Sequence, residues 1–213
     1  MDKVILKAVF STLMAIIVLC GVMTAALVFI YPSTMMGLAY DVGLDNASAW
    51  FAGRAYNQLD NVYYIAFATE VSIGTGDMEK IDEYGSKFIL DESFGEYCSR
   101  MDEQTSGIGN SYAQYVYGQV CMAKYRLGKG EEAVELSFSI NEDCFPPKNA
   151  AAAVLLIALQ RNGQEDLPVI ENILARLKAL QEEQKTNKTF SDEDLEYLES
   201  MIKLTEMRME NFS

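Results

Sequence analysis

The first pattern along the chain is an unbroken run of apolar positions. Residues 8–31 read AVFSTLMAIIVLCGVMTAALVFIY and contain no charged side chain. Because an α-helix rises about 1.5 Å per residue, this run reaches roughly 36 Å, enough to cross a hydrocarbon core of ~30 Å. Tyr31 suits a membrane–water interface, and Pro32 suits the end of a helix. The pattern predicts a transmembrane helix over 8–31, preceded by a short N-terminal segment, 1–7.

A secretory signal peptide is the alternative interpretation of the same run. Signal peptides usually have an apolar region of about 7–15 residues followed by an A-x-A-like cleavage site. Here the best such site, Gly37-Leu38-Ala39, lies well beyond the apolar run. A lipoprotein site at Cys20 fits less well, because Leu19 is bulky and the run continues after the cysteine. The sequence therefore favours an uncleaved, single-pass membrane anchor.

The residues that flank and line this run predict its orientation and contacts. Lys3 and Lys7 precede it, and the first basic residue after it is Arg54. By the positive-inside rule, we expect a cytoplasmic N-terminus and an extracytoplasmic soluble domain. Gly21 and Ala25, four residues apart, form a small-xxx-small pair that would let two spans approach closely and oligomerise. Small residues are also common in membrane helices that make no such contact.

Beyond the run, helical periodicity alternates with glycine-containing turns. The clearest turn is LGKGEEA, residues 127–133. Its first glycine suits the end of a helix, and its acidic pair suits the first turn of the next helix. Turns of this form begin at residues 43, 76, 128 and 162, so the intervals between them are 33, 52 and 34 residues. The turns therefore recur at a nearly fixed spacing with one extra stretch.

This spacing resembles that of the tetratricopeptide (TPR) family, whose repeat is about 34 residues long. The chain from about 33 to 180 is similar to degenerate TPR repeats, and MAKYRLGKGEEA is the clearest match. That segment has the small, apolar, glycine and alanine residues that the family prefers, at Ala123, Leu127, Gly128 and Ala133. The resemblance implies an all-α fold in which helical hairpins stack as an α-solenoid. Only Cys121 and Ala133 keep the family's pair of small packing residues, so a non-repeating stack of hairpins is the alternative.

One insertion and one terminal helix complete this organisation. The interval of 52 residues is longer than the family's repeat of about 34 residues. The extra residues fall around 91–110, where a short helix is expected near Phe94–Asp102. Insertions in repeats map to loops that often lie on a functional face, although a tolerated surface loop is the simpler interpretation. Ser191 and Asp194 resemble a capping box that begins a helix over 190–212. We expect this helix to cap the repeats with a solvated outer face.

Charge and composition exclude several classes of function. The net charge is −14, and the first 31 residues carry only Asp2, Lys3 and Lys7, so the acidity lies in the remainder. Such an acidic domain would repel the phosphates of nucleic acids. The chain has no histidine, which removes the commonest general base and the commonest transition-metal ligand. No phosphate-binding glycine loop occurs either, so we expect no enzyme, no catalytic residue, no metal and no cofactor.

The four cysteines fit no zinc motif, since the sequence has no C-x-x-C pair and no histidine. Cys20 lies in the apolar run, and Cys121 occupies a helix position where it would serve as a small apolar residue. Cys98 and Cys144 form a candidate disulfide if the insertion folds back onto the repeats. The alternative is that these two remain thiols, since three cysteines outside the span cannot all pair internally.

The TPR resemblance implies a function in protein–protein interaction. In that family the first helix of each hairpin lines a concave surface. Carried over by repeat position, the groove-facing candidates are Tyr63, Glu70, Tyr115, Met122, Tyr125, Arg126, Asn149 and Gln160. Tyrosine and arginine are common anchors for a bound peptide, although aromatic residues of first helices often only pack. We therefore expect a membrane-anchored scaffold or adaptor of the cell envelope that binds a protein or peptide. The alternative is an accessory subunit that packs into a larger membrane complex through broad helical faces.

Overall fold

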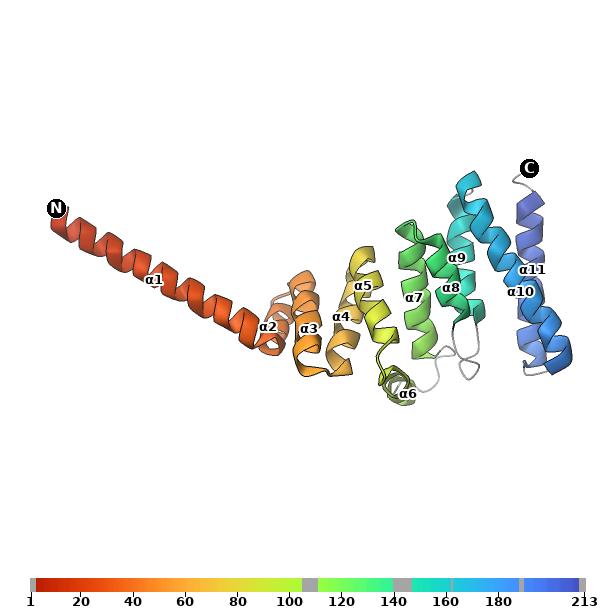
Figure 1. Ribbon diagram of the computed structural model, residues 1–213, viewed down its shortest axis with the longest axis horizontal. Coiled ribbons are helices and arrows are strands. Elements are labelled where there is room, and N and C mark those ends of the chain that lie inside the picture. Colours follow the sequence, from red (N-terminus) through yellow and green to blue (C-terminus); the bar gives the residue numbers. More distant parts are fainter. Residues whose placement is uncertain (1–2, 105–110, 140–146, 162, 188–189, 211–213) are drawn as a thin grey trace. The chain divides into compact units, whose positions relative to one another are not determined.

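The fold consists of α-helices joined by short turns. The computed structural model describes residues 3–104, 111–139, 147–161, 163–187 and 190–210. These residues form eleven α-helices and one short 3-10 helix, and none of them lies in a β-strand (Figure 1). The all-α fold class predicted from the sequence is therefore confirmed. The chain divides into two compact units, Met1–Thr75 and Gly76–Ser213.

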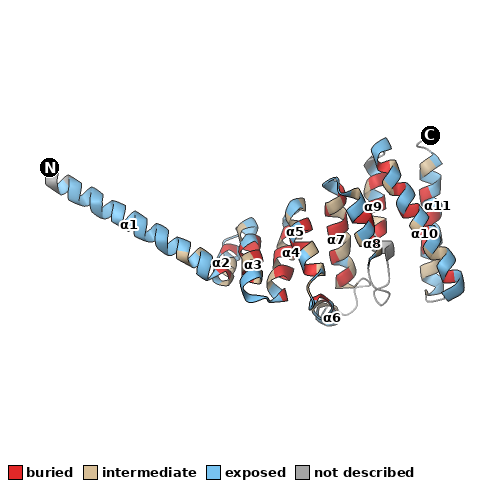
Figure 2. Cartoon of the chain, viewed as in Figure 1, coloured by how far each residue is buried: buried red, intermediate tan, exposed pale blue. Residues whose placement is uncertain are grey.

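The longest helix of the first unit is α1 (Lys3–Ile30), which is apolar on all sides. Within its segment Lys7–Ile30, the most apolar 18-residue window has a mean hydropathy of 2.8 and buries none of its residues against the chain. Figure 2 shows this helix exposed along nearly its whole length. Among the described residues it alone is long and apolar enough to cross a membrane. Gly21 and Ala25 lie exposed on it, and their contact with a second span stays a prediction.

Three shorter helices complete the first unit. They are α2 (Pro32–Asp41), α3 (Asp45–Leu59) and α4 (Val62–Thr75). Pro32 begins α2, where its missing N–H group leaves no helical hydrogen bond unmade. α3 packs against both α2 and α4. Its buried face consists of small residues that let the neighbouring helices approach closely, together with Phe51: Ser48, Ala49, Ala52, Gly53 and Ala55.

The second unit is built around α7 (Tyr112–Arg126), which packs against α5, α6, α8 and α9. The other elements are α5 (Met78–Ile89), α6 (Phe94–Gln104), α8 (Gly130–Phe138), α9 (Pro147–Arg161), η1 (Gln164–Asp166), α10 (Leu167–Asn187) and α11 (Asp192–Met209). One hydrophobic core is shared by the five helices from α7 through α11, and Cys121, Val154 and Ile173 are among its fully buried members. The core therefore depends on contacts between helices that are far apart in the sequence.

Glycine turns end three helices at the positions that the sequence indicates. Gly43 (φ 74°), Gly76 (φ 71°) and Gly128 (φ 79°) follow α2, α4 and α7 in the left-handed backbone region. That region is strained for residues with a side chain, which explains the choice of glycine. The fourth turn differs, because Gly163 has a φ of −90° and leads into the 3-10 helix η1 instead.

The insertion predicted around 91–110 contains α6, and residues 105–110 lie outside the described part of the chain. Phe94 of α6 is buried. Its ring centroid lies 4.9 Å from that of Phe88 on α5 and 5.9 Å from that of Tyr117 on α7. This half of the insertion is therefore a packed helix that shares the aromatic core of the second unit.

The last helix begins with the capping box that the sequence contains. The Ser191 hydroxyl accepts a hydrogen bond from the backbone N–H of Asp194 at 3.2 Å, and Asp194 Oδ2 accepts one from the Ser191 N–H at 3.4 Å. α11 packs mainly against α10 and buries Leu198, Met201 and Ile202. Its outer side is only partly polar, because large apolar side chains are also exposed there: Tyr197, Leu204 and Met207.

Candidate functional site

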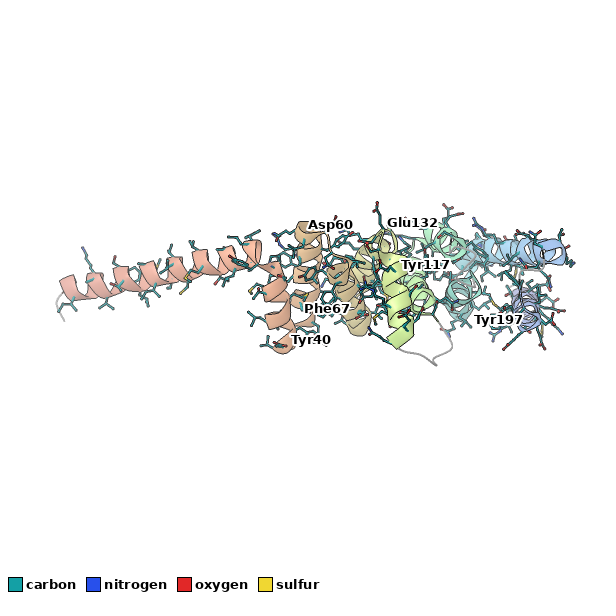
Figure 3. All side chains as sticks on the ribbon, turned by 90° about the horizontal axis from the view of Figure 1, so that it is seen from below. Tyr40, Asp60, Phe67, Tyr117, Glu132 and Tyr197 are labelled. Carbon is teal, nitrogen blue, oxygen red and sulfur yellow. The ribbon has the colours of Figure 1, made fainter. Side chains whose placement is uncertain are left out.

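A pocket of ≈ 320 Å³ opens in the first unit on α2, α3 and α4. It is lined by Tyr40, Asp45, Phe67, Glu70, Val71, Gly74 and Thr75. The ring centroids of Tyr40 and Phe67 lie 5.3 Å apart in an edge-to-face arrangement (Figure 3). The pocket therefore combines an aromatic wall with two carboxylates, those of Asp45 and Glu70. We call it the aromatic–acidic pocket.

Two of the sequence-predicted candidates belong to this region. Tyr63, Phe67 and Glu70 are four and three residues apart, so they share one face of α4. Tyr63 is 49% exposed, and its ring centroid lies 6.4 Å from that of Phe67. The other side of α4 faces the core through Ile65 and Thr69, which are fully buried. The helix is thereby fixed with its aromatic stripe outward.

Tyr40 and Asp45 reach the pocket because of the turn between α2 and α3. The Gly43 N–H donates to the Tyr40 carbonyl at 2.9 Å, and the Leu44 N–H donates to the Ala39 carbonyl at 2.8 Å. These bonds close the end of α2, and the Leu44 carbonyl then accepts the Ser48 N–H at 2.9 Å as α3 begins. Tyr40, Asp45 and Phe67 were not among the candidates predicted from the sequence. Phe67 had a recognisable signal, since it lies on the same helical stripe as Tyr63 and Glu70.

The chemistry of the aromatic–acidic pocket favours a cation beside an apolar group. Aromatic faces attract a lysine or arginine head, and carboxylates form charge-assisted hydrogen bonds with it. Tyr40, which is 52% exposed, and Phe67 offer apolar surface within the same pocket. Exposed tyrosines supply large contact area at little cost in side-chain entropy. The pocket is therefore suited to recognising a short polypeptide segment.

In the second unit, three candidates lie along one exposed face of α7. Tyr115, Met122 and Arg126 are seven and four residues apart, and Tyr115 is 45% exposed. Arg126 Nη1 lies 4.0 Å from the Met78 sulfur of α5. Gln160 is exposed on α9. The side chain of Asn149, the remaining candidate on α9, lies outside the described part of the structure.

Tyr125 differs from the other candidates because it is buried, with only 3% of its surface exposed. Its hydroxyl donates a hydrogen bond to Oδ1 of Asp166, which is also buried. Oδ2 of the same carboxylate accepts the N–H of Gly163 at 3.3 Å. Tyr125 thus joins α7 to η1 and packs in the core.

A larger pocket of ≈ 730 Å³ lies near Tyr125, between the α7–α8 turn and the start of α10. Its charged lining is mostly acidic: Lys129, Glu131, Glu132, Glu165 and Asp166. Gly130 lies close to Val169 at its edge, because an added Cβ would lie 2.9 Å from Cγ2 of Val169 and that side chain would have to shift. The aromatic residue in its lining is the buried Tyr125. This pocket therefore lacks the exposed aromatic anchors of the first one.

A buried carboxylate holds the α7–α8 turn against α5. Asp82 Oδ1 and Oδ2 lie 2.6 Å from the ammonium groups of Lys124 and Lys129, respectively, and Lys124 lies 2.9 Å from Glu132 Oε2. Burial opposes ionisation of Asp82, but its hydrogen bonds and attraction to the two lysines outweigh burial and lower its pKa below 3.8. For Lys124, burial is likewise outweighed by its two carboxylate partners, which raise its pKa. The network is structural, since each charge has a partner.

The cysteines offer little reactivity in the described structure. Burial raises the pKa of the Cys121 thiol to about 12, so it stays protonated at neutral pH. Cys98 is buried on α6. The predicted partner Cys144 lies outside the described residues, so the disulfide stays a prediction. Among the described residues, no cluster of three cysteine, aspartate or glutamate side chains is arranged to hold a metal ion.

Comparisons with known proteins add no relative. No family model matches the sequence, and neither a characterised protein nor a solved structure matches it.

Proposed function

We propose that the protein is a membrane-anchored interaction module, in which α1 crosses a membrane once and the helices after it bind a protein partner. The apolar segment Lys7–Ile30 supports the anchor, because it has the length and composition of a span and its most apolar window has no buried residue. Lys3 and Lys7 support a cytoplasmic N-terminus and an extracytoplasmic helical domain in the cell envelope.

The TPR-like character of the domain is part of the same proposal. In the first unit α2 and α3 form a pair joined by the turn at 43. In the second unit α7 pairs with α8 and α9 pairs with α10, joined by the turns at 128 and 163, and the helices of each pair are in contact. In the second unit α7 packs against both its own partner α8 and the next first helix, α9. This is the contact pattern expected when hairpins stack. α11 then covers α10, as a capping helix would.

The aromatic–acidic pocket is the observation that carries the functional proposal. It brings Tyr40 and Phe67 together with Asp45 and Glu70 on the exposed side of the first unit. Its partner is a polypeptide segment that presents a lysine or arginine next to an apolar side chain. This choice also agrees with the negative charge of the chain, which attracts basic partners.

Site-specific photo-crosslinking in the native host tests this proposal. Tyr63, beside the pocket, is replaced by p-benzoylphenylalanine, and Tyr197 on α11 is replaced in a second variant as a matched exposed tyrosine. The interaction-module proposal expects one dominant adduct at position 63 that a synthetic peptide from the crosslinked partner segment displaces. If position 63 gives no adduct, or if the peptide fails to compete, the pocket is not the binding site.

An accessory subunit of a larger complex is the second candidate function. The exposed Tyr197, Leu204 and Met207 on α11 favour it, because they offer an apolar face on a helix that would otherwise be a solvated cap. In the same experiment, this function expects adducts at position 197 that no short peptide displaces. A subunit needs its whole partner for stable packing, whereas a groove binder holds an isolated segment.

A further inference from the structure

One basic side chain of the first unit lies at the end of the apolar helix α1. The guanidinium carbon of Arg54, on α3, lies 4.6 Å from the centroid of the Phe29 ring and 5.0 Å from that of Trp50. Gln58, one turn further along α3, donates from Nε2 to the Phe29 carbonyl at 2.8 Å. Trp50, Arg54 and Gln58 are four residues apart and share one face of α3. This face therefore holds the C-terminal end of α1.

The Arg54 charge is not neutralised by the part of the chain that the structure describes. No ion pair of the described residues includes it, and its Nε is buried without a hydrogen-bond partner. It is also the sole basic residue between Lys7 and Lys80. A guanidinium that lies over aromatic faces directs its N–H donors along its own plane, where two oxygens of one acceptor can bind them. A buried or half-buried charge of this kind calls for an anionic partner.

The position of Phe29 on α1 indicates how deep in the bilayer Arg54 would bind an anionic partner. Phe29 is the second-last residue of α1, at the end of the segment that is long enough to cross a bilayer. If α1 crosses, Phe29 lies at the edge of the hydrocarbon and Arg54 lies among the lipid phosphates. The exposed rings of Tyr31 (56%) and Trp50 (41%) lie at the same end of α1, where interfacial aromatic residues are usual.

We propose that Arg54, between Phe29 and Trp50, binds the phosphate of a phospholipid headgroup and so docks the first helical unit against the bilayer surface. This inference rests on the membrane crossing of the proposed function. Arginine forms bidentate hydrogen bonds with phosphate oxygens, which lysine does not reproduce. The contact opposes the repulsion that the acidic domain would otherwise experience near an anionic surface. It therefore sets how the binding surface of the first unit is presented relative to the membrane.

The chain contains a built-in reporter, because Trp50 is its single tryptophan. The full-length protein is placed in phosphatidylcholine vesicles with nitroxide fatty esters that carry the label near the headgroup or near the middle of the bilayer. We expect quenching of Trp50 to be strong with the shallow label and weak with the deep one. In phosphate-free galactolipid vesicles, the shallow quenching of the wild-type protein is expected to fall and the emission to shift to the red.

The variants test whether Arg54 is the cause. Arg54→Gln in phosphatidylcholine is expected to reproduce the wild-type behaviour in galactolipid, and Arg54→Lys to restore part of the shallow quenching. Arg100→Gln, which removes an exposed arginine of the second unit, is expected to leave the quenching unchanged. Equal shallow quenching in Arg54→Gln and the wild type would overturn the inference. If Arg54→Gln loses helical circular dichroism, the shallow quenching of wild-type Trp50 in phosphatidylcholine and in galactolipid is compared instead. Equal quenching in the two lipids would then overturn the inference.

Two further arms separate the alternatives. Inorganic phosphate added to the galactolipid vesicles would restore the Trp50 signal only if Arg54 binds a free anion, and this result contradicts a lipid site. Tags at the two ends of the chain, tested for protease access in sealed vesicles, report the crossing itself. Tags on the same side would overturn the proposed anchor. Tags on opposite sides, with quenching that depends on neither phosphate nor Arg54, would overturn the lipid site alone.

Discussion

The hydroxyl of Tyr125 on α7 donates a hydrogen bond to Oδ1 of Asp166 on η1, and the two residues are 41 positions apart in the sequence. Both side chains are 3% exposed. The bond therefore fixes the start of α10 relative to α7 within the core of the second unit. It also explains why a tyrosine at a predicted groove position serves packing instead.

Replacing Tyr125 by phenylalanine removes the donor and leaves the buried carboxylate oxygen without it. We expect Tyr125→Phe to lower the free energy of unfolding by about 1–3 kcal/mol, the usual cost of an unsatisfied buried polar group. Tyr63→Phe removes a hydroxyl from an exposed tyrosine, and its effect is expected to stay within about 0.5 kcal/mol. Denaturant unfolding of the full chain in a mild detergent compares the two. Equal effects would show that the Tyr125 hydroxyl contributes nothing specific.

The Asp82 network predicts a component of stability that depends on pH. Because the pKa of Asp82 in the folded state lies below 3.8, its stabilising effect is complete above that pH and is lost as pH falls through the lower, folded value. We expect the melting temperature of the wild type to fall more steeply than that of Asp82→Asn below pH 3.8. Melting curves of both proteins measured at successive pH values provide the test.

At neutral pH, Asp82→Asn is expected to be less stable than the wild type, by about 1–3 kcal/mol, because two lysines lose a charged acceptor. Glu199→Gln on α11 changes the charge by the same amount at an exposed position and serves as the control. If the two variants have parallel pH profiles, the Asp82 network is not a source of stability.

The backbone at Gly128 predicts opposite effects for two glycine replacements. Gly128 has a φ of 79°, so Gly128→Ala is expected to destabilise the protein by about 1–2 kcal/mol. Gly118 lies inside α7 with nothing within 4 Å of an added Cβ, so Gly118→Ala is expected to stabilise it by about 0.5–1 kcal/mol. Thermal unfolding of both variants shows whether each replacement lowers or raises the stability of the protein. A neutral or stabilising Gly128→Ala would contradict the left-handed turn.

The aromatic–acidic pocket predicts how binding responds to the loss of one charge. Once the crosslinked segment is known, Glu70→Gln is expected to weaken its binding about tenfold, since a charge-assisted hydrogen bond to the cation becomes a neutral one. Glu199→Gln, on α11 of the second unit, is expected to leave affinity unchanged. Fluorescence anisotropy with the labelled segment at two salt concentrations measures both. A salt-insensitive affinity that Glu70→Gln does not change would exclude a cationic ligand at this pocket.

The sequence by itself determined the features that depend on local physics. An uncharged apolar run indicates a helix with the properties of a span whatever follows it. Glycines at 43, 76 and 128 mark helix ends, because the backbone there is left-handed and residues with a side chain disfavour that conformation. Ser191 and Asp194 mark a helix start because they are three residues apart, the spacing at which each can hydrogen-bond the backbone of the other. Repeat position in the TPR resemblance likewise selected Tyr63 and Glu70 as candidates on one helix.

Only the tertiary structure decided which residues meet across helices. Tyr40 joins Phe67, Asp82 binds Lys124 and Lys129, and Arg54 lies over Phe29 because the packing of helices brings distant positions together. Periodicity gives the face on which a side chain lies but not the neighbour that this face contacts. Repeat position in the TPR resemblance predicted a groove-facing Tyr125, whereas its hydrogen bond to Asp166 joins α7 to η1 within the core.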